Sequence, residues 1–440
     1  MPECLCEEMQ VVVLMGGLGT RLKEYTHNCP KPMVEIEGKP FFEYQLRLMK
    51  LAGFRKFVFC LGYRAEMVES YFGDGHQFGV EITYSYDGPR LLGTGGAIRK
   101  ALPLLEQDFM LIYGDSFMDI NYFEVVVRYR NGLQAGKKAL MTIMKNCNRF
   151  DCSNVVCEQG EILLYDKKVK RSDMQYIDYG VSVFRRSVFE SLSEDCVIDL
   201  ADLQSELSRD HLLSACEVEK RFYEIGTHNS LTEFSAYVKQ RWGTPNKAIF
   251  LDRDGVINEI IWNDDIEQLD SPLKEEEFCL LPQVVDALKC LSEQGYLLFV
   301  VTNQPAAAKG KTTYATLCSI NHQFVQMMDR AGVEITEVQM CPHYGKKSAH
   351  TKEYFLIRNC DCRKPKTGMI QNILDKYNID LNCSWMVGDS ATDIICGKDA
   401  GLHTVFIGRF KCDLCQQFAD ARPDITCNNL YAFAKGLLKC

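Results

Sequence analysis

Apolar, β-branched runs alternate with amphipathic stretches along nearly the whole chain. In the first half, the runs at 9–15, 55–62 and 108–115 predict buried strands. Helical spacing of apolar residues over 40–53, ended by Gly53, predicts a helix between the first two of these strands. This order predicts a mostly parallel sheet with helices on both faces.

The same pattern begins again near residue 247. Apolar runs predict a further helix at 281–295 and strands at 247–255, 296–304, 384–389 and 403–408. Between the two halves, residues 238–247 include a Gly, a Pro and an Asn, which indicate a short linker. We therefore predict an α/β protein of two doubly wound domains, residues 8–241 and 246–440.

Composition and charge narrow the class of protein. The 440 residues are 46% hydrophobic and 25% charged, which is ordinary for a protein with two buried cores. A net charge of −9 argues against nucleic acid or an anionic membrane as the main partner. Because the first residues are acidic and no apolar run is long enough to span a membrane, we expect a cytoplasmic protein. Its 21 cysteines are then reduced thiols or metal ligands. A homo-oligomer stays possible.

A glycine-rich turn follows the first predicted strand. It holds three glycines and a threonine, and two cations follow: Gly16, Gly17, Gly19, Thr20, Arg21 and Lys31. Backbone N–H groups in such a turn can approach a polyphosphate closely, and the cations suit a triphosphate. The turn lacks the lysine of a P-loop and the third glycine of a dinucleotide fingerprint. On the glycines alone, a plain tight turn is an equal alternative.

GGLGTRL (16–22) followed by PKPM (30–33) resembles the signature of sugar-1-phosphate nucleotidylyltransferases. Five further segments match that family in order, at 91–102, 113–115, 165–167, 178–184 and 222–231. The resemblance covers about residues 10–240 and implies a Rossmann-like nucleotidyltransferase fold. In this family a sugar-1-phosphate attacks the α-phosphorus of a nucleoside triphosphate and pyrophosphate leaves.

The resemblance also implies roles for individual residues. Arg21 and the glycine turn would hold the β- and γ-phosphates, and Lys31 the α-phosphate. The remaining roles are Mg²⁺ binding by Asp115 and Glu224, a sugar-phosphate contact by Lys167, and backbone that accommodates the sugar at Gly96 and Gly180. Many relatives carry Asp at the position of Glu224, and Lys168 is an alternative to Lys167.

Two carboxylates close the predicted strand that begins the second half. Asp252 and Asp254 lie two apart, which suits one nucleophile and one general acid/base. LDRDG (251–255) resembles the first motif of the haloacid dehalogenase superfamily. Three further motifs follow in order and supply Thr302, Lys364 and Asp389. This resemblance implies a phosphatase fold, and the short segment between 258 and 281 implies that the domain has no large cap.

By this resemblance, Asp252 forms an aspartyl-phosphate, and Asp254 protonates the leaving alkoxide and then activates water. Thr302, Asn303 and Lys364 would bind phosphoryl oxygens, with Lys366 as a rival for the role of Lys364. Mg²⁺ would be held by Asp252, the Asp254 carbonyl and Asp389, with Asp393 as an additional ligand or a support for the others. Arg363 would shape the substrate pocket.

A second group of ligand-type residues precedes this lysine. Cys341, His343, Cys360 and Cys362 offer the nitrogen and sulfur ligands of a tetrahedral zinc. With 21 cysteines, a Cys-x-Cys pair is expected by chance, so the position beside Arg363 carries the argument. CPH…CDCRKP resembles the zinc-loop phosphatases of heptose bisphosphate and histidinol phosphate, which implies a closed, structural zinc site.

The two resemblances indicate one another's substrates. Removal of the 7-phosphate from heptose 1,7-bisphosphate would give the heptose 1-phosphate that a guanylyltransferase joins to GTP, yielding GDP-heptose. An alternative is a mannose-1-phosphate guanylyltransferase, or a uridylyl or cytidylyl enzyme, joined to another small-substrate phosphatase. A non-catalytic scaffold is a distant alternative, because the full catalytic set is present.

Overall fold

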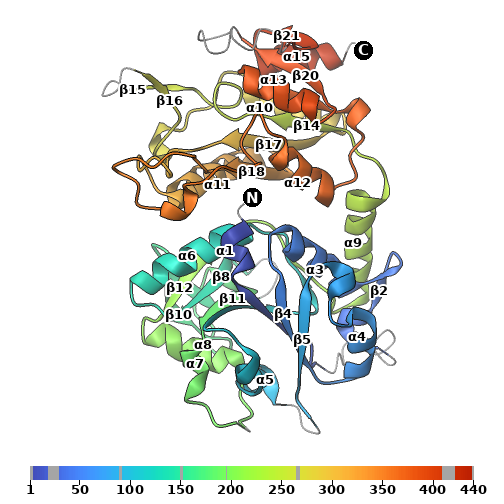
Figure 1. Ribbon diagram of the computed structural model, residues 1–440, viewed down its shortest axis with the longest axis vertical. Helices are drawn as coiled ribbons and strands as arrows, with labels where there is room; N and C mark the ends of the chain where they lie inside the picture. Colours follow the sequence, from blue (N-terminus) through green and yellow to red (C-terminus); the bar gives the residue numbers. More distant parts are fainter. Residues whose placement is uncertain are drawn as a thin grey trace. The chain divides into compact units, whose positions relative to one another are not determined.

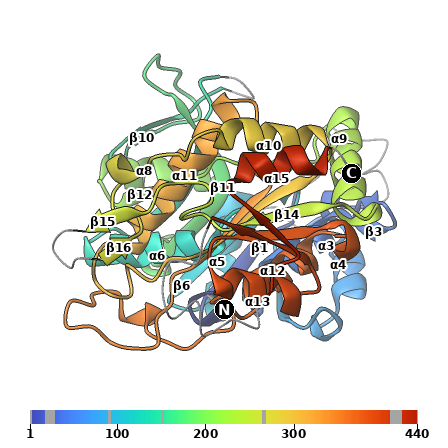
Figure 2. The same ribbon diagram turned by 90° about the horizontal axis from the view of Figure 1, so that it is seen from above.

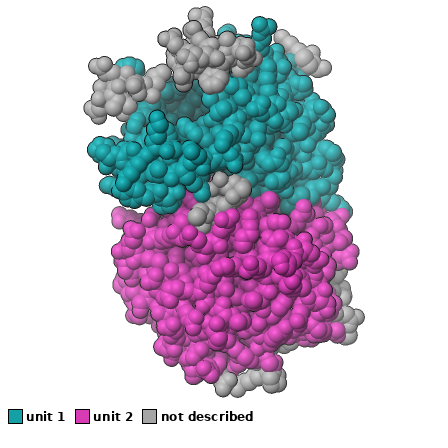
Figure 3. Space-filling view, in the orientation of Figure 1, with its two compact units in different colours: residues 1, 239–440 teal, residues 2–238 magenta. Residues whose placement is uncertain are grey.

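The computed structural model describes residues 3–17, 29–88, 92–148, 152–194, 196–263, 268–408 and 422–438. The chain forms two compact units, residues 2–238 and 239–440, coloured separately in Figure 3. In the part of the chain that is described, no helix combines the length and the apolar character needed to cross a membrane.

The first unit is built on a nine-stranded sheet with helices on both faces (Figure 1). In spatial order its strands are β5 (Glu81–Tyr86), β4 (Lys56–Leu61), β1 (Gln10–Leu14), β6 (Asp108–Tyr113), β11 (Tyr176–Arg185), β8 (Ala139–Lys145), β12 (Leu213–Glu217), β10 (Glu161–Tyr165) and β9 (Val155–Glu158). Its helices are α1 (Glu3–Glu7), α3 (Phe41–Leu51), α4 (Ala65–Phe72), α5 (Gly93–Ala101), α6 (Tyr122–Gln134), α7 (Ser187–Glu190), α8 (Leu200–Arg209) and α9 (His228–Val238). Two small pairs complete it: β2 (Glu35–Ile36) with β3 (Lys39–Pro40), and β7 (Ser116–Phe117) with β13 (Tyr223–Glu224).

The predicted strands and the helix of this half are confirmed, but the sheet is only partly parallel. The four strands from β5 to β6 are parallel, whereas β11 runs antiparallel to β6 on one side and to β8 on the other. Because β11 lies in the middle of the sheet, the strand direction changes there. The predicted mostly parallel arrangement is therefore wrong beyond β6.

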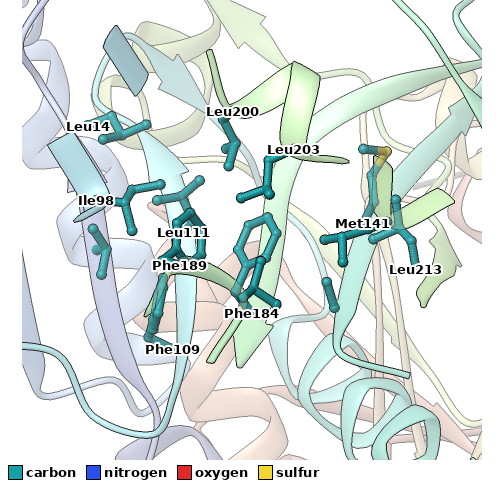
Figure 4. Close-up of a cluster of buried hydrophobic side chains, with 14 of the residues drawn as sticks. Leu14, Ile98, Phe109, Leu111, Met141, Phe184, Phe189, Leu200, Leu203 and Leu213 are labelled. Atoms are coloured by element: carbon teal, nitrogen blue, oxygen red, sulfur yellow. The ribbon is translucent and has the colours of Figure 1, made fainter. Parts of the chain in front are cut away.

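Successive side chains of each strand point to opposite faces of the sheet, and hydrophobic side chains cover both faces. Figure 4 shows Leu14 of β1 and Leu111 of β6 on the same side as Ile98 of α5 and Leu203 of α8. On the opposite face, Phe59 of β4 meets the ring of Phe42 in α3 at 5.4 Å. Each such side chain contributes roughly 1.5–3 kcal/mol when it leaves water, so both faces hold the sheet in register.

The second unit is a six-stranded, wholly parallel sheet. In spatial order its strands are β18 (Glu337–Cys341), β17 (Leu297–Asn303), β14 (Ala248–Leu251), β19 (Trp385–Gly388), β20 (His403–Ile407) and β21 (Ile425–Cys427). One face packs on α10 (Val284–Glu293), α11 (Tyr314–Arg330) and α15 (Leu430–Leu437), and the other on α12 (Gly368–Lys376) and α13 (Ala391–Asp399). Figure 2 shows α10 and α15 side by side.

The predicted strands and helix of this half are also confirmed. Between β14 and α10 the described chain forms only a hairpin, β15 (Ile261–Asn263) with β16 (Gln268–Asp270), and a short 3₁₀ turn. Before β14, residues Lys239–Gly243 form a π-helix, in which the buried Arg241 stacks on the Tyr377 ring. The linker is therefore ordered where it joins the second unit.

Each sheet has a topological switch point, where two adjacent parallel strands connect onward to strands on opposite sides of the sheet. In the first unit this point lies between β1 and β6, and in the second between β14 and β19. Open α/β sheets bind ligands at the carboxyl ends of strands beside such a point. The residues that follow these strands are therefore the candidates for the two active sites.

Candidate active sites

A pocket of about 220 Å³ opens at the carboxyl ends of β1 and β6. Four residues predicted from the sequence line it: Gly16, Gly17, Lys31 and Asp115. The 3₁₀ turn at Lys31–Met33 brings the lysine back over the strand ends, where its Nζ lies 2.7 Å from Oδ2 of Asp115. The pocket thus holds a lysine and an aspartate in contact, beside the backbone of two glycines.

Glu224 is brought next to Asp115 by strand pairing. In the β7–β13 pair, Glu224 lies opposite Ser116, and the Ile225 amide donates to the Asp115 carbonyl at 3.0 Å. Carboxylate oxygens are ligands that Mg²⁺ prefers, and the pairing brings the backbones of Asp115 and Glu224 together. Both residues offer the oxygen ligands that magnesium needs, Glu224 is exposed, and a magnesium ion held by the pair stays a prediction.

The pocket also contains an acid that the sequence interpretation missed. Asp87 follows β5, is 8% exposed, and accepts a hydrogen bond from the Leu92 amide. Burial raises the pKa of this carboxyl, and the Leu92 hydrogen bond and nearby Lys100 offset the effect only in part. A Cβ on Gly16 would lie 3.1 Å from Oδ2 of Asp87, so the acid faces the glycine turn.

Among the described residues, the other sites predicted in the first unit are not part of the pocket lining. Gly96 packs its α5 turn against the 196–198 segment, and a Cβ there would lie 2.3 Å from the Cys196 carbonyl oxygen. Gly180 has φ +100, which favours glycine, and lies beside Tyr113, a pocket residue. Gly19, Thr20 and Arg21 lie outside the described residues.

Lys167 and Lys168 differ in their surroundings. Lys168 pairs with Asp202 at 2.5 Å on the surface. Lys167 is close enough to the half-buried Asp178 to offset part of the rise in its pKa that desolvation causes. Since Asp178 lies close to Tyr113 at the pocket, Lys167 is the better placed of the two.

In the second unit, four predicted residues converge at the ends of β14 and β19. Lys364 Nζ lies 2.8 Å from Asp252 Oδ1 and 2.6 Å from Asp393 Oδ1. Oxygen atoms of Asp252, Asp389 and Asp393 lie within 4.8 Å of one another. Burial, together with the neighbouring acids, raises the pKa of Asp252 to about 8 even with Lys364 beside it. A divalent cation would offset this repulsion, so the donor set fits Mg²⁺.

Asp254 lies in a different environment. Its Oδ1 accepts from Arg253 and Asn258, and its Oδ2 accepts from Ser271 at 2.8 Å and Gln304 at 2.5 Å. Burial raises the pKa of Asp254, but these donors outweigh burial and hold the pKa below its ordinary value. Without a cation the two motif acids are thus pushed in opposite directions, and it is the nucleophile candidate Asp252 whose pKa is raised. A divalent cation beside Asp252 would lower its pKa and keep the carboxylate ionised.

Thr302 and Asn303 end β17 beside these acids. The Asn303 side chain exchanges two hydrogen bonds with the backbone of Lys364, at 3.0 and 3.1 Å, and so fixes the lysine. Thr302 is buried and accepts from Gln304 at 2.9 Å. Gln304 and Ser271 were missed from the sequence, although Gln304 directly follows the predicted pair.

The four predicted zinc ligands form one cluster. Sγ of Cys341 lies 3.6 Å from Sγ of Cys360 and 3.2 Å from Sγ of Cys362, which lies 3.2 Å from Nδ1 of His343. A tetrahedral zinc with bonds of ~2.0–2.3 Å needs ligand separations of about 3.3–3.8 Å. The donor set therefore fits zinc. Arg363 beside it donates to the His343 carbonyl at 3.4 Å.

A family model described as nucleotidyl transferase matches residues 10–241. The chain belongs to this family. A HAD-hydrolase-like model matches residues 361–433, which include the motif lysine and Asp389.

Three curated relatives match one half or the other. D-glycero-alpha-D-manno-heptose 1-phosphate guanylyltransferase of Aneurinibacillus thermoaerophilus is 30% identical over 49% of this chain and 88% of the relative. D-glycero-beta-D-manno-heptose-1,7-bisphosphate 7-phosphatase of Pasteurella multocida is 35% identical over 37% of this chain and 81% of the relative. The corresponding alpha-bisphosphate 7-phosphatase of Photorhabdus laumondii is 31% identical over 43% of this chain and 95% of the relative. The chain is thus a bifunctional enzyme, a nucleotidyltransferase fused to a HAD-type phosphatase.

In this nucleotidyltransferase–phosphatase, the structure brings more of the predicted residues together in the phosphatase site than in the transferase site. In the phosphatase, Asp252, Lys364, Asp389 and Asp393 meet at the β14–β19 switch, and Asn303 holds the backbone of Lys364. In the transferase, Lys31 and Asp115 meet in the pocket, Glu224 is adjacent by strand register, and Gly96 is accounted for by helix packing.

Proposed function

We propose that the enzyme makes GDP-heptose in two consecutive steps. The phosphatase removes the 7-phosphate from D-glycero-D-manno-heptose 1,7-bisphosphate, and the transferase joins the resulting heptose 1-phosphate to GTP. The observation that supports this proposal is the pairing of the two relatives. The second half resembles a 7-phosphatase of heptose 1,7-bisphosphate, and loss of the 7-phosphate from that compound gives heptose 1-phosphate. Heptose 1-phosphate is the substrate named for the relative of the first half.

The shared intermediate selects the anomer. The phosphatase relatives are named for both alpha and beta bisphosphates, whereas the guanylyltransferase relative is named for the alpha 1-phosphate. Hydrolysis at position 7 does not alter the anomeric centre. Two fused sites that share an intermediate therefore use the alpha anomer throughout.

In the transferase, Lys31 would meet the α-phosphate, where negative charge develops as the sugar phosphate attacks. Asp115 and Glu224 would hold Mg²⁺, which supplies charge neutralisation at the triphosphate. Since Lys31 is paired with Asp115 in the described structure, the lysine exchanges this partner for phosphate when substrate binds. Arg21 would hold the outer phosphates.

The nucleobase is proposed to be guanine because of Asp87. A buried carboxylate accepts two parallel hydrogen bonds best, and guanine offers the donors N1–H and N2–H₂ on one edge. Adenine and cytosine present a single donor group with an acceptor beside it, which a carboxylate repels. Asp87 lines the pocket that also holds the glycine turn and Lys31.

In the phosphatase, Asp252 attacks phosphorus, the bond to the sugar oxygen breaks, and the departing alkoxide takes a proton from Asp254. Asp254 then takes a proton from water, whose oxygen attacks the aspartyl-phosphate and releases phosphate and free Asp252. Lys364 and Thr302 hold the phosphoryl oxygens. Asp252, Asp389 and the Asp254 carbonyl would hold Mg²⁺, which would lower the charge repulsion between the carboxylates and the phosphate. Zinc at the cysteine–histidine cluster would fix the loop that ends in Arg363.

The test is ³¹P NMR of the full chain with Mg²⁺, the alpha 1,7-bisphosphate and each nucleoside triphosphate in turn. We expect loss of the 7-phosphate signal first, then a sugar diphosphate signal with GTP alone. An intact bisphosphate, or a nucleotide-sugar formed equally well with ATP, CTP or UTP, would refute the substrates. Mannose 1-phosphate serves as the competing transferase substrate.

A further inference from the structure

Gln304, a wholly buried glutamine, lies at the end of β17 beside the phosphatase centre. It follows Asn303, the last residue of that strand, and its backbone amide donates to the Cys341 carbonyl at 2.8 Å. Cys341 ends the neighbouring strand β18 and belongs to the cysteine–histidine cluster. The backbone at Gln304 is therefore held in place independently of the glutamine side chain.

The side-chain amide of Gln304 bridges two groups of the catalytic centre. Its Nε2 donates to Asp254 Oδ2 at 2.5 Å and to Thr302 Oγ1 at 2.9 Å. An amide nitrogen carries two N–H groups, so both hydrogen bonds form at once. The carboxylate proposed to protonate the leaving group and the hydroxyl proposed to bind phosphoryl oxygens are thus held by one nitrogen.

The orientation of this amide is determined by its neighbours. A rotated amide would place Oε1 of Gln304 against the carboxylate of Asp254, and two acceptors form no hydrogen bond. In the orientation that remains, Oε1 is buried and has no hydrogen-bond partner. An unpaired buried acceptor costs about 1–3 kcal/mol, and a hydrogen bond to a charged group contributes a similar amount. The contact with Asp254 is therefore what offsets the unpaired oxygen.

The two oxygens of Asp254 face different groups. Oδ1 accepts from Arg253 and Asn258, both of which are wholly buried. Oδ2 accepts from Gln304 and from Ser271, which is half-buried. Oδ1 is thus tied to the protein interior, whereas Oδ2 shares a donor with the phosphate-binding hydroxyl. Oδ2 is therefore the oxygen placed to exchange a proton with a bound substrate or water.

We propose that Gln304 is a positioning residue of the phosphatase, which directs Oδ2 of Asp254 at the leaving-group oxygen. This inference rests on the role proposed for Asp254 as general acid/base. No atom of Gln304 enters the reaction: the departing oxygen takes its proton from Oδ2 of Asp254, and the amide sets where that oxygen lies. A glutamine that only stabilised the fold would affect all phosphate esters alike, whereas the positioning role predicts a dependence on the leaving group.

The test compares p-nitrophenyl phosphate with phenyl phosphate, which differ only in the nitro group. p-Nitrophenolate leaves without a proton, whereas the more basic phenolate leaves faster when an acid protonates it. For the full chain with Mg²⁺, Gln304→Met should lower kcat/KM for phenyl phosphate about 10-fold, in line with the loss of a partner that orients an active-site group. The value for p-nitrophenyl phosphate should stay near that of the wild type. Asp254→Asn is the reference and should show the same selectivity with a loss of about 10²-fold.

The matched control is Gln294→Met. Gln294 follows α10, and its Nε2 donates to the Cys290 carbonyl at 3.0 Å. It lies just before β17 begins, at the sheet edge opposite the catalytic centre, so this variant should keep the wild-type ratio of the two kcat/KM values.

The outcomes separate the inference from the role on which it rests. A wild-type ratio in Gln304→Met, beside a lowered ratio in Asp254→Asn, would overturn the positioning role alone. A ratio unchanged in both variants would overturn the role proposed for Asp254, and the inference with it. If Gln304→Met has no activity on either ester, the ratio is taken from Gln304→Leu, and the same outcomes apply.

Discussion

The ammonium of Lys364 lies 2.6 Å from Oδ1 of Asp393, and both side chains are almost wholly buried. The other oxygen of Asp393 accepts from the Ser390 hydroxyl at 2.6 Å and the Ser390 amide at 3.0 Å. Both oxygens of Asp393 are thus engaged. This geometry favours a role for Asp393 in positioning Lys364, which also contacts Asp252.

Asp393→Asn should therefore lower phosphatase turnover about 10- to 100-fold, the usual cost of losing a residue that orients an active-site group. The amide keeps the shape but removes the charge that, with Asp252, holds the pKa of Lys364 above its ordinary value. Turnover of p-nitrophenyl phosphate measures the effect. Nucleotidyl transfer by the same preparation is the internal control, and an equal loss of both activities would indicate unfolding rather than mispositioning.

Lys31→Met should slow nucleotidyl transfer about 10²- to 10³-fold in kcat, because a charge directed at the transition state is lost. The lysine that pairs with Glu43 at 2.6 Å, Lys39, provides the matched control. Lys39→Met should keep most of the transfer rate. Pyrophosphate release with GTP and sugar 1-phosphate measures both variants, and similar rates for the two would contradict the role given to Lys31.

Asp87→Ala should erase the enzyme's preference for GTP over ITP. ITP keeps N1–H but lacks the N2 amino group, so the wild type should use it about 10-fold less well, the worth of one hydrogen bond to a charged group. The ratio of kcat/KM for the two nucleotides is the measurement. A ratio near one in the wild type, or one unaltered by the substitution, would show that Asp87 does not contact the base.

The sequence identified those site residues that directly follow an apolar run. Asp115, Asp252 and Asp389 each come just after a buried strand, so strand periodicity alone predicts that they lie at a sheet edge. Asp87 also follows a strand, but β5 alternates buried and exposed residues, so it gave no such run. Its link to Gly16 exists only in the folded chain.

Other contacts could not be predicted from a sequence motif, because they too form only in the folded chain. Ser271 is seventeen positions from Asp254, and Lys309 meets Tyr344 only after two loops pack. The antiparallel half of the first sheet was missed because β11 enters between β6 and β8, a pairing that local patterns do not encode.

Gly96→Ala should destabilise the first unit, whereas Gly17→Ala should not. A Cβ on Gly96 would lie 2.3 Å from a backbone oxygen, which cannot yield as a flexible side chain would, and such overpacking costs roughly 1–3 kcal/mol. A Cβ on Gly17 meets nothing within 4 Å but enters the pocket. Gly17→Ala should therefore raise KM for GTP at unchanged melting temperature. Thermal unfolding and steady-state kinetics distinguish the two, and matching behaviour would contradict the packing role of Gly96.

Purified enzyme should contain one zinc per chain. Cys362→Ser should reduce this content to near zero, because a serine hydroxyl replaces one of four converging ligands. Cys383→Ser, at an exposed cysteine outside the cluster, is the control and should keep the metal. Since Cys362 directly precedes Arg363 and Lys364, loss of zinc should also abolish most phosphatase activity while nucleotidyl transfer continues. Elemental analysis beside both assays decides the matter: a metal-free wild type with full phosphatase activity would show that the cluster is a set of buried thiols.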